Sequence, residues 1–278
     1  MRIFLSALES NSDKIIAYLQ KQNIKVKSGL VSYYYLGKQL KSDSNKLEKV
    51  KSFCDEILVD SGAHSFQSGA RVDWLEYTKR YAAWIKKVDC DQILGFFEMD
   101  VDSVIGYEKV LELRKILDEA TNKIIPVWHK NRGIGEFKKM VNETKGDIVA
   151  IAGFQNEDIA DDQFNKFVNY AHHRGKKIHA LGMTRQKVLR KVPFDYVDSS
   201  SWKQGAMYGN ALTYQGGKIK AKNVSGRFET EDLMMIGLEA YMKLADYYNA
   251  MWAHINHDLY KIWQFVISCL LKKTKVVF

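Results

Sequence analysis

An alternation of short apolar runs with helical patterns constrains the fold of this chain more than any other feature. Eight such runs lie between residues 2 and 202, and a helical pattern or a loop follows each of them. This alternation is typical of a parallel sheet covered by helices, and eight units over roughly 200 to 300 residues predict a (β/α)8 barrel, the TIM barrel. A doubly wound open sheet is the alternative, but no Gly-x-Gly-x-x-Gly motif follows the first run. The predicted strands are Arg2–Leu8, Gly29–Tyr33, Ile57–Val59, Ile93–Met99, Ile124–Trp128, Asp147–Ala152, Lys177–Leu181 and Phe194–Val197.

The most regular helical pattern is Asp73–Val88, with Trp74, Tyr77, Tyr81 and Trp84 at helical spacing. We expect these aromatic side chains to pack in the core rather than to form a base-stacking platform. The tyrosines that end the second strand allow a helical continuation there as an alternative. The other predicted helices are Asn11–Gln22, Lys46–Cys54, Gly106–Thr121, Gly135–Thr144, Asp161–His173 and Arg185–Lys191, with helices again from about Thr230.

The composition is that of one globular domain. Of the 278 residues, 46% are hydrophobic and 27% charged, and no low-complexity or proline-rich segment marks a boundary. We expect a single domain over 1–278, with the barrel at about 1–226 and a C-terminal helical segment without a zinc subdomain at about 227–278. The formal net charge of +9 suggests a polyanionic partner, although excess lysine also aids solubility.

Cysteine usage and the two ends of the chain indicate a reduced, cytoplasmic protein that is not bound to a membrane. Cys54, Cys90 and Cys269 are widely spaced, and no Cys/His pair has zinc-ligand spacing. We therefore expect no metal. The first apolar run is too short for a signal peptide, and the run Ile262–Leu271 is too short and too polar to cross a bilayer.

Polar residues stand where most predicted strands end. The clearest case is Glu56–Gln67, in which an apolar run delivers Asp60 directly into Ser-Gly-Ala-His-Ser. An isolated Asp in such a place is commonly a turn former or a helix cap. A barrel, however, would bring all the strand ends to one face, and two carboxylates across such a face suit chemistry at an anomeric carbon. These strand-end residues are Ser32, Asp60, Glu98, Asp100, His129, Gly153, Gln155, Gly182 and Asp198.

The order of these motifs resembles the tRNA-guanine transglycosylase family, including its short relatives in phages and DNA-modification systems. The resemblance covers about residues 26 to 202. Val59-Asp60-Ser61-Gly62-Ala63 looks like the family's Asp-Ser-Gly-Gly motif and is the most distinctive element. The other matching segments are Leu30–Leu36, Phe97–Asp100, Pro126–His129, Ala150–Phe154, Ala180–Gly182 and Tyr196–Asp198.

The resemblance implies roles for individual residues. Asp198 matches the nucleophile and Asp60 the general acid/base. Asp100, or alternatively Glu98, matches the acid that reads the edge of guanine. The family's stacking aromatic corresponds to His64, with Phe66 two residues later, and its base-contacting Gln corresponds to His129. The remaining residues that the resemblance places at the base are Ser61, Gly62, Gly153, Phe154, Gln155, Leu181 and Gly182.

The expected reaction is base exchange, in which a free 7-deazaguanine replaces guanine in a nucleic acid through an Asp-linked intermediate without a cofactor. The family's zinc site, which supports tRNA binding, has no counterpart here, and this favours DNA. A tRNA-guanine transglycosylase, an N-glycosidase and a non-catalytic nucleic-acid-binding barrel remain alternatives. The residues expected to hold phosphates are Lys130, Arg132, Arg185, Lys187, Arg190 and Lys191, with Lys218, Lys220 and Lys222 in the region Tyr208–Lys222.

Overall fold

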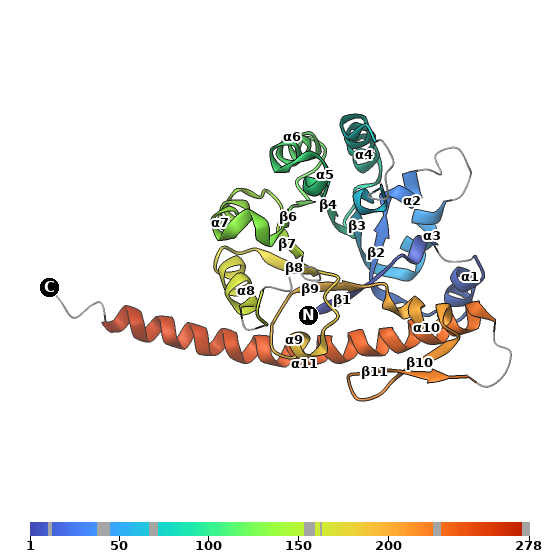
Figure 1. Cartoon of the computed structure of the whole chain (residues 1–278). Coiled ribbons are helices and arrows are strands. Elements are labelled where there is room, and N and C mark those ends of the chain that lie inside the picture. The colour runs from blue at the N-terminus through green and yellow to red at the C-terminus, as the bar shows by residue number, and fades with distance from the viewer. Residues whose placement is uncertain are drawn as a thin grey trace.

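The core of the protein, seen here in a computed structural model, is a closed barrel of parallel strands (Figure 1). The hydrogen-bonded strand order is β5-β4-β3-β2-β1-β9-β8-β7-β6. The structure describes residues 1–10, 13–37, 45–66, 72–152, 159–161, 163–224 and 229–273, and at residues 10, 14, 15 and 254–273 the backbone alone. The barrel strands are β1 (Arg2–Ser6), β2 (Val26–Ser32), β3 (Cys54–Asp60), β4 (Ile93–Phe97), β5 (Ile124–Ile125), β6 (Val127–Trp128), β7 (Ile148–Ala152), β8 (Lys177–Leu181) and β9 (Tyr196–Ser199).

Pro126 explains why nine strand segments make an eight-stranded barrel. It stands between β5 and β6 and has no N–H to donate, so it interrupts the ladder at one residue. The carbonyl of Pro126 still accepts a hydrogen bond from the Ala150 N–H (2.9 Å), while β5 pairs with β4 and β6 with β7. The two segments therefore act as one strand that closes the barrel, and the predicted (β/α)8 fold is confirmed.

Helices surround the barrel at the positions that the periodicity predicts (Figure 1). Asp73 caps α4, because its side chain accepts a hydrogen bond from the Glu76 N–H (3.0 Å). Tyr77, Tyr81 and Trp84 are buried, which confirms core packing for these aromatics. The helices are α1 (Asp13–Lys21), α2 (Tyr33–Gly37), α3 (Lys46–Phe53), α4 (Trp74–Val88), α5 (Asp102–Ile105), α6 (Tyr107–Asp118), α7 (Gly133–Glu143), α8 (Phe164–His173), α9 (Gln186–Leu189), α10 (Gln204–Met207) and α11 (Thr230–Lys273).

Apolar side chains fill the barrel interior below its carboxyl end. Phe4, Leu58, Phe97 and Tyr196 belong to one inner cluster that is separate from the larger core between strands and helices. Because side chains alternate along a strand, Ser6, Asp60 and Asp198 lie two residues beyond inner-cluster members on the same side of their strands. The packed interior thus supports a polar layer at the mouth. The other members of the inner cluster are Leu30, Ile125, Val127, Ile148 and Ala150.

The segment after β9 differs from the prediction. No strand was predicted between Val197 and Thr230, but the chain forms an antiparallel ribbon of β10 (Asn210–Tyr214) and β11 (Ile219–Asn223) that lies along α11. One helix, α11, then begins at the predicted Thr230 and continues to Lys273. The expected boundary near Gly226 lies outside the described residues. Within the part of the chain that is described, no helix is long and apolar enough to span a bilayer.

Gly237 allows α11 to approach the end of β9 closely. A Cβ atom at this residue would lie 2.2 Å from the Trp202 carbonyl oxygen. Gly237→Ala should therefore destabilise the protein by about 1–3 kcal/mol, since relieving the clash must move backbone. The matched variant Gly135→Ala, in α7 with open space around it, should instead stabilise by up to about 1 kcal/mol. Urea unfolding of both variants checks the two signs, and a stabilising Gly237→Ala would refute this packing.

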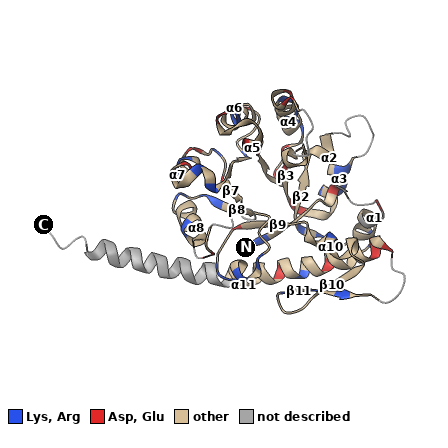
Figure 2. Cartoon of the chain, viewed as in Figure 1, with Lys and Arg blue, Asp and Glu red and all other residues tan. Residues whose placement is uncertain are grey.

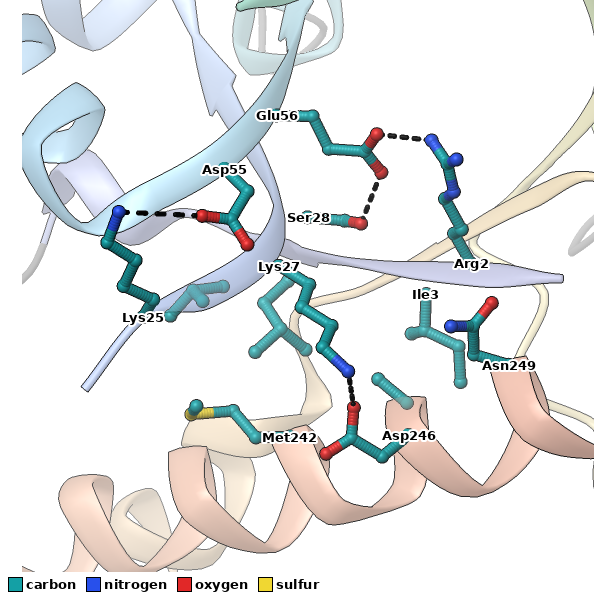
Figure 3. A pocket seen from close by; sticks show the side chains of 13 residues that line it. Arg2, Ile3, Lys25, Lys27, Ser28, Asp55, Glu56, Met242, Asp246 and Asn249 are labelled. Carbon is teal, nitrogen blue, oxygen red and sulfur yellow. Dashed lines mark hydrogen bonds and ion pairs between the residues drawn. The ribbon is translucent and has the colours of Figure 1, made fainter.

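A cavity of about 270 Å³ lies at the opposite end of the barrel, between the amino ends of β1–β3 and α11 (Figure 3). Its charged side chains pair with one another, and Lys27 reaches from β2 to α11 (Figure 3). The amino-terminal face of such barrels serves stability rather than chemistry. We therefore interpret the Lys27–Asp246 pair as fastening α11 to the barrel floor. The three ion pairs are Arg2–Glu56, Lys25–Asp55 (3.8 Å) and Lys27–Asp246 (2.7 Å).

Candidate active site

Asp198, near the carboxyl end of β9, is held by three hydrogen-bond donors from neighbouring strands. Its Oδ1 accepts from the His179 Nε2 and from the Gly182 N–H, both at 2.9 Å, and its Oδ2 accepts from the Ser6 hydroxyl at 3.1 Å. Burial alone would raise the pKa of this carboxyl, but the hydrogen bond and charge of His179 outweigh it and the pKa falls below its ordinary value. Asp198 is therefore an oriented anion at the mouth.

His179 was not anticipated from the sequence. It lies in the middle of β8, is fully buried, and contacts the rings of Phe4 and Phe97. Its Nδ1 has no hydrogen-bond partner among the described residues. A histidine whose Nε2 is hydrogen-bonded to a carboxylate is fixed in its orientation. His179 thus positions Asp198 from below.

Asp60 ends β3 in a different electrostatic environment. Its Oδ2 accepts hydrogen bonds from the Gly62 N–H (2.9 Å) and the Ser32 hydroxyl (3.4 Å). Burial raises the pKa of Asp60 to about 6, and the negative charge of Asp198 adds to the shift. The two strand-end carboxyls therefore differ in the ease with which they hold a proton, Asp60 being the acid and Asp198 the anion.

The turn after Asp60 requires glycine. Gly62 has φ +74°, and a Cβ atom there would lie 2.3 Å from the Tyr34 Cβ and 2.9 Å from the Ser32 Oγ. Only glycine lets the backbone N–H turn back onto Asp60. The preceding Ser61 is buried, and its carbonyl accepts a hydrogen bond from the Tyr77 hydroxyl (2.8 Å). The Ser-Gly pair thus shapes the site through its backbone.

A second polar group at the mouth joins Asp100 to His129. The His129 Nε2 and an Asp100 oxygen are 2.6 Å apart. Burial would lower the pKa of His129, but the hydrogen bond and charge of Asp100 raise it. Both side chains stay partly exposed, so the pair can meet a ligand. Arg132 also belongs to this group, because its Nη2 lies 2.9 Å from an Asp102 oxygen and 3.8 Å from an Asp100 oxygen.

Asp100, Asp102 and His129 also satisfy the spacing of a metal site, since their ligand atoms lie within 4.8 Å of one another. The Arg132 guanidinium already neutralises these carboxylates, and it lies over the Tyr107 ring at 4.1 Å. A divalent ion would have to displace this buried cation. We therefore interpret the group as an ion-paired network, and the expectation of no metal stays a prediction.

Two predicted contact residues lie elsewhere. Glu98 is fully buried, and its carboxylate accepts hydrogen bonds from the Arg114 Nε (2.5 Å) and the Val127 N–H (2.7 Å). It therefore cannot contact the edge of a base. Of the two acids considered for that role, Asp100 is the one at the mouth. Phe66 packs edge-to-face against other aromatic rings beside the barrel rather than standing free as a stacking surface. Its ring partners are Tyr34, Trp74 and Tyr77.

The remaining predicted residues are placed as follows. His64 is exposed on the turn after β3, and its contact with a base stays a prediction. Leu181 packs on the inner cluster, and Gly182, with φ +60°, directs its N–H to Asp198 rather than to a ligand. Gly153, Phe154 and Gln155, and also Gln67, lie outside the described residues. The base contacts of Gly153, Phe154 and Gln155 therefore stay predictions.

Glu9 is a further acid at the mouth that was not predicted from the sequence. It lies in the turn Leu8–Ser10 after β1, is fully buried, and accepts a hydrogen bond from the Ser32 N–H (3.2 Å). Its Oε2 has no hydrogen-bond partner within the described chain. Burial raises the pKa of Glu9 to about 7, although the positive charge of Lys203 opposes the shift. Its place after a strand, like that of Asp60, was the available signal.

This buried acid gives a test of stability against pH. Because the pKa of Glu9 is raised from 4.5 to about 7 in the folded protein, protonation of Glu9 stabilises the folded state. This stabilisation is complete below pH 4.5 and is lost as the pH rises through 7. The loss corresponds to about 3 kcal/mol. Glu9→Gln should remove this decline, whereas Glu108→Gln, at an exposed helical residue, should retain it. Urea unfolding at several pH values measures the difference, and parallel curves for wild type and Glu9→Gln would contradict this assignment.

The predicted phosphate-binding side chains differ in how free they are. Arg132 is only 3% exposed and is committed to Asp102, so it is withdrawn from that role. Arg185 and Lys187 both pair with Asp161, at 3.0 and 3.8 Å. Figure 2 shows the Lys and Arg residues distributed over the helices and the ribbon rather than gathered on one helix.

Comparison with known proteins adds little to this geometry. No family model and no curated protein matches the sequence. A solved structure described as "QR15, an Aldolase" has a TM-score of 0.45 and 15% sequence identity, over 72% of this chain and 89% of that chain. A likeness of this degree carries no information on the reaction. The function must therefore be inferred from the site alone.

Proposed function

We propose that the protein is a base-exchange transglycosylase that replaces guanine in a nucleic acid, preferably DNA, by a 7-deazaguanine. One observation carries the proposal. Two carboxyls face the same barrel mouth, and their surroundings move their pKa values in opposite directions, Asp198 downward and Asp60 to about 6. Carboxyl pairs separated in this way divide the roles of anion and acid in glycosidic chemistry.

In the first step, an Asp198 oxygen attacks C1′ of the target nucleotide. The bond between C1′ and the guanine nitrogen breaks, and Asp60 donates its proton to the departing base. The product is free guanine and a sugar joined to Asp198 through an ester bond. The donors on Asp198 fix its attacking lone pair without protonating it.

In the second step, the incoming 7-deazaguanine gives its N–H proton to the Asp60 carboxylate. The resulting nitrogen attacks C1′ and displaces Asp198, which returns to its anionic form. Two inversions give net retention of configuration. Because one glycosidic bond is exchanged for another, the reaction needs no cofactor.

The Asp100–His129 pair supports recognition of guanine. A carboxylate can accept two hydrogen bonds from the donor edge of this base, and His129 holds one Asp100 oxygen in place. Such contacts to a base edge within a barrel mouth require that the target nucleotide be unpaired or flipped out. DNA is the nucleic acid that we propose, because the resemblance extends to the short relatives found in DNA-modification systems.

Hydrolysis is the second candidate, because an N-glycosidase would use the same two carboxyls with water as the acceptor. Incubation of a guanine-containing oligonucleotide with labelled guanine separates the two reactions. An exchange enzyme should incorporate the label without leaving abasic sites. Abasic sites without incorporation would instead establish hydrolysis. If neither product forms in DNA or in RNA, both reactions are rejected.

A further inference from the structure

The β10–β11 ribbon presents a row of lysines on its outer side. Lys220 and Lys222 lie opposite Thr213 and Ala211 in the register, so they share one side of the ribbon, and Lys218 stands at the turn just before them. The opposite side packs against α11 through Leu212, which is 7% exposed. We call Lys218, Lys220 and Lys222 the lysine face.

The charge of the lysine face is not balanced within the ribbon. Residues 210–223 contain these three lysines and no acidic residue, and all three are exposed. None of them has an ion pair or a hydrogen bond from its side chain in the part of the chain that the structure describes. By contrast, Lys27 and Lys49 pair with acids. Like charges in a row repel one another, and an anionic partner would relieve that repulsion.

Two large apolar side chains stand directly before the ribbon. Met207 and Tyr208 are 73% and 75% exposed, which is more than any other large hydrophobic residue among those described. The segment that carries them is anchored at the mouth, because the indole N–H of the buried Trp202 donates to the Ser6 carbonyl (3.0 Å). Ser6 in turn donates its hydroxyl to Asp198. An exposed aromatic ring next to a basic row is a combination typical of surfaces that bind nucleic acids.

We propose that Tyr208 and the lysine face form a nucleic-acid contact surface outside the barrel mouth. The lysines hold phosphates of the strand that flanks the target nucleotide, and the Tyr208 ring stacks on an unpaired base of that strand. A two-stranded ribbon also has dimensions that a nucleic-acid groove admits. This inference rests on the proposed function for its assumption that the substrate is a nucleic acid.

The lysine face is tested by binding, separately from catalysis. The variant Lys218→Gln/Lys220→Gln/Lys222→Gln is compared with Lys79→Gln/Lys86→Gln/Lys87→Gln on α4, which removes the same charge from exposed residues elsewhere. Both are made in an Asp198→Asn background, and binding of single-stranded DNA, duplex DNA and RNA is measured between about 50 and 200 mM salt. The ribbon variant should lose about 2 to 3 units from the slope of log K against log salt. The α4 variant should keep the slope of its parent.

Tyr208 is tested with two substitutions. Tyr208→Ala should weaken binding of single strands about 5- to 150-fold without changing the salt slope, because it removes stacking and not a charge. Tyr208→Phe should retain the affinity, since the ring face remains. Equal losses in both variants would contradict stacking.

The inference is overturned if the ribbon variant binds with the parental affinity and slope, or if the wild-type protein binds no nucleic acid. It is also overturned if the variant loses binding only to vesicles that contain phosphatidylserine. If base exchange fails while nucleic-acid binding still depends on the lysine face, the proposed function alone is rejected. If base exchange occurs while nucleic-acid binding does not depend on the lysine face, this contact surface alone is rejected.

Discussion

Asp198→Asn should lower kcat/KM for guanine release by about 10⁴-fold or more, because the amide cannot attack C1′. Asparagine keeps the size of the side chain and one oxygen that can accept from His179 or Gly182. The fold should therefore survive. Asp198→Ala is a poorer variant, since it leaves the donors of a buried site without a partner and should destabilise by about 1–3 kcal/mol.

Asp195→Asn is the matched control for this substitution. Asp195 immediately precedes β9 but pairs with His172 and the Ile178 N–H, away from the mouth. Its replacement should leave guanine release within a few-fold of wild type. Activity that survives in Asp198→Asn, measured with pure protein on the same oligonucleotide, would remove the nucleophile from this account.

Asp60→Asn should lower guanine release by about 10²- to 10⁴-fold and should change its pH dependence. In the wild type, Asp60 must be protonated to donate to the leaving base. With its pKa at about 6, kcat/KM should fall tenfold per pH unit above that value. The asparagine variant has no proton to lose, so this alkaline limb should disappear from its profile.

Ser32→Ala provides an independent check on the same limb. The Ser32 hydroxyl donates a hydrogen bond to the Asp60 Oδ2 (3.4 Å) and therefore favours the carboxylate form of Asp60. Removing this donor should raise the pKa of Asp60 and move the alkaline limb to higher pH. A limb that stays in place in Ser32→Ala and in Asp60→Asn would assign it to another group.

The barrel could be predicted from the sequence because each strand carries its own local signal. The β7 bounds, Ile148–Ala152, agree with the prediction to within one residue, since a buried parallel strand is a continuous apolar run. The second strand shows the limit. Its tyrosines are as suited to a strand as to a helix, and packing of Tyr33 against α4 gives them a helical turn.

The β10–β11 ribbon could have been found from its turn. Gly216 and Gly217 both have positive φ, and Gln215 and Lys218 exchange backbone hydrogen bonds across them. Two glycines between short strands are a known hairpin signal. The signal was obscured because the exposed strand β11 is mostly polar and shows no apolar alternation.

The candidate site was predictable only in part. Asp60 and Asp198 stand at strand ends, and position alone suggested them. Glu9 and His179 act through burial, which depends on how β1, β2 and β8 come together and cannot be read from one segment. Glu98 shows the converse. It has the residue type and position of a site acid, but Arg114 draws it into the core.

The mass of the intact protein shows whether a covalent intermediate forms on Asp198. Wild-type protein is mixed with a guanine-containing DNA oligonucleotide without a free 7-deazaguanine and is quenched in acid, and RNA is treated in parallel. We expect a species that is heavier than the protein by the mass of the oligonucleotide less guanine. Its adduct should lie on the peptide that contains Asp198 and should be absent from Asp198→Asn. Release of guanine with no such adduct at any time point, or an adduct that persists in Asp198→Asn, would contradict this expectation.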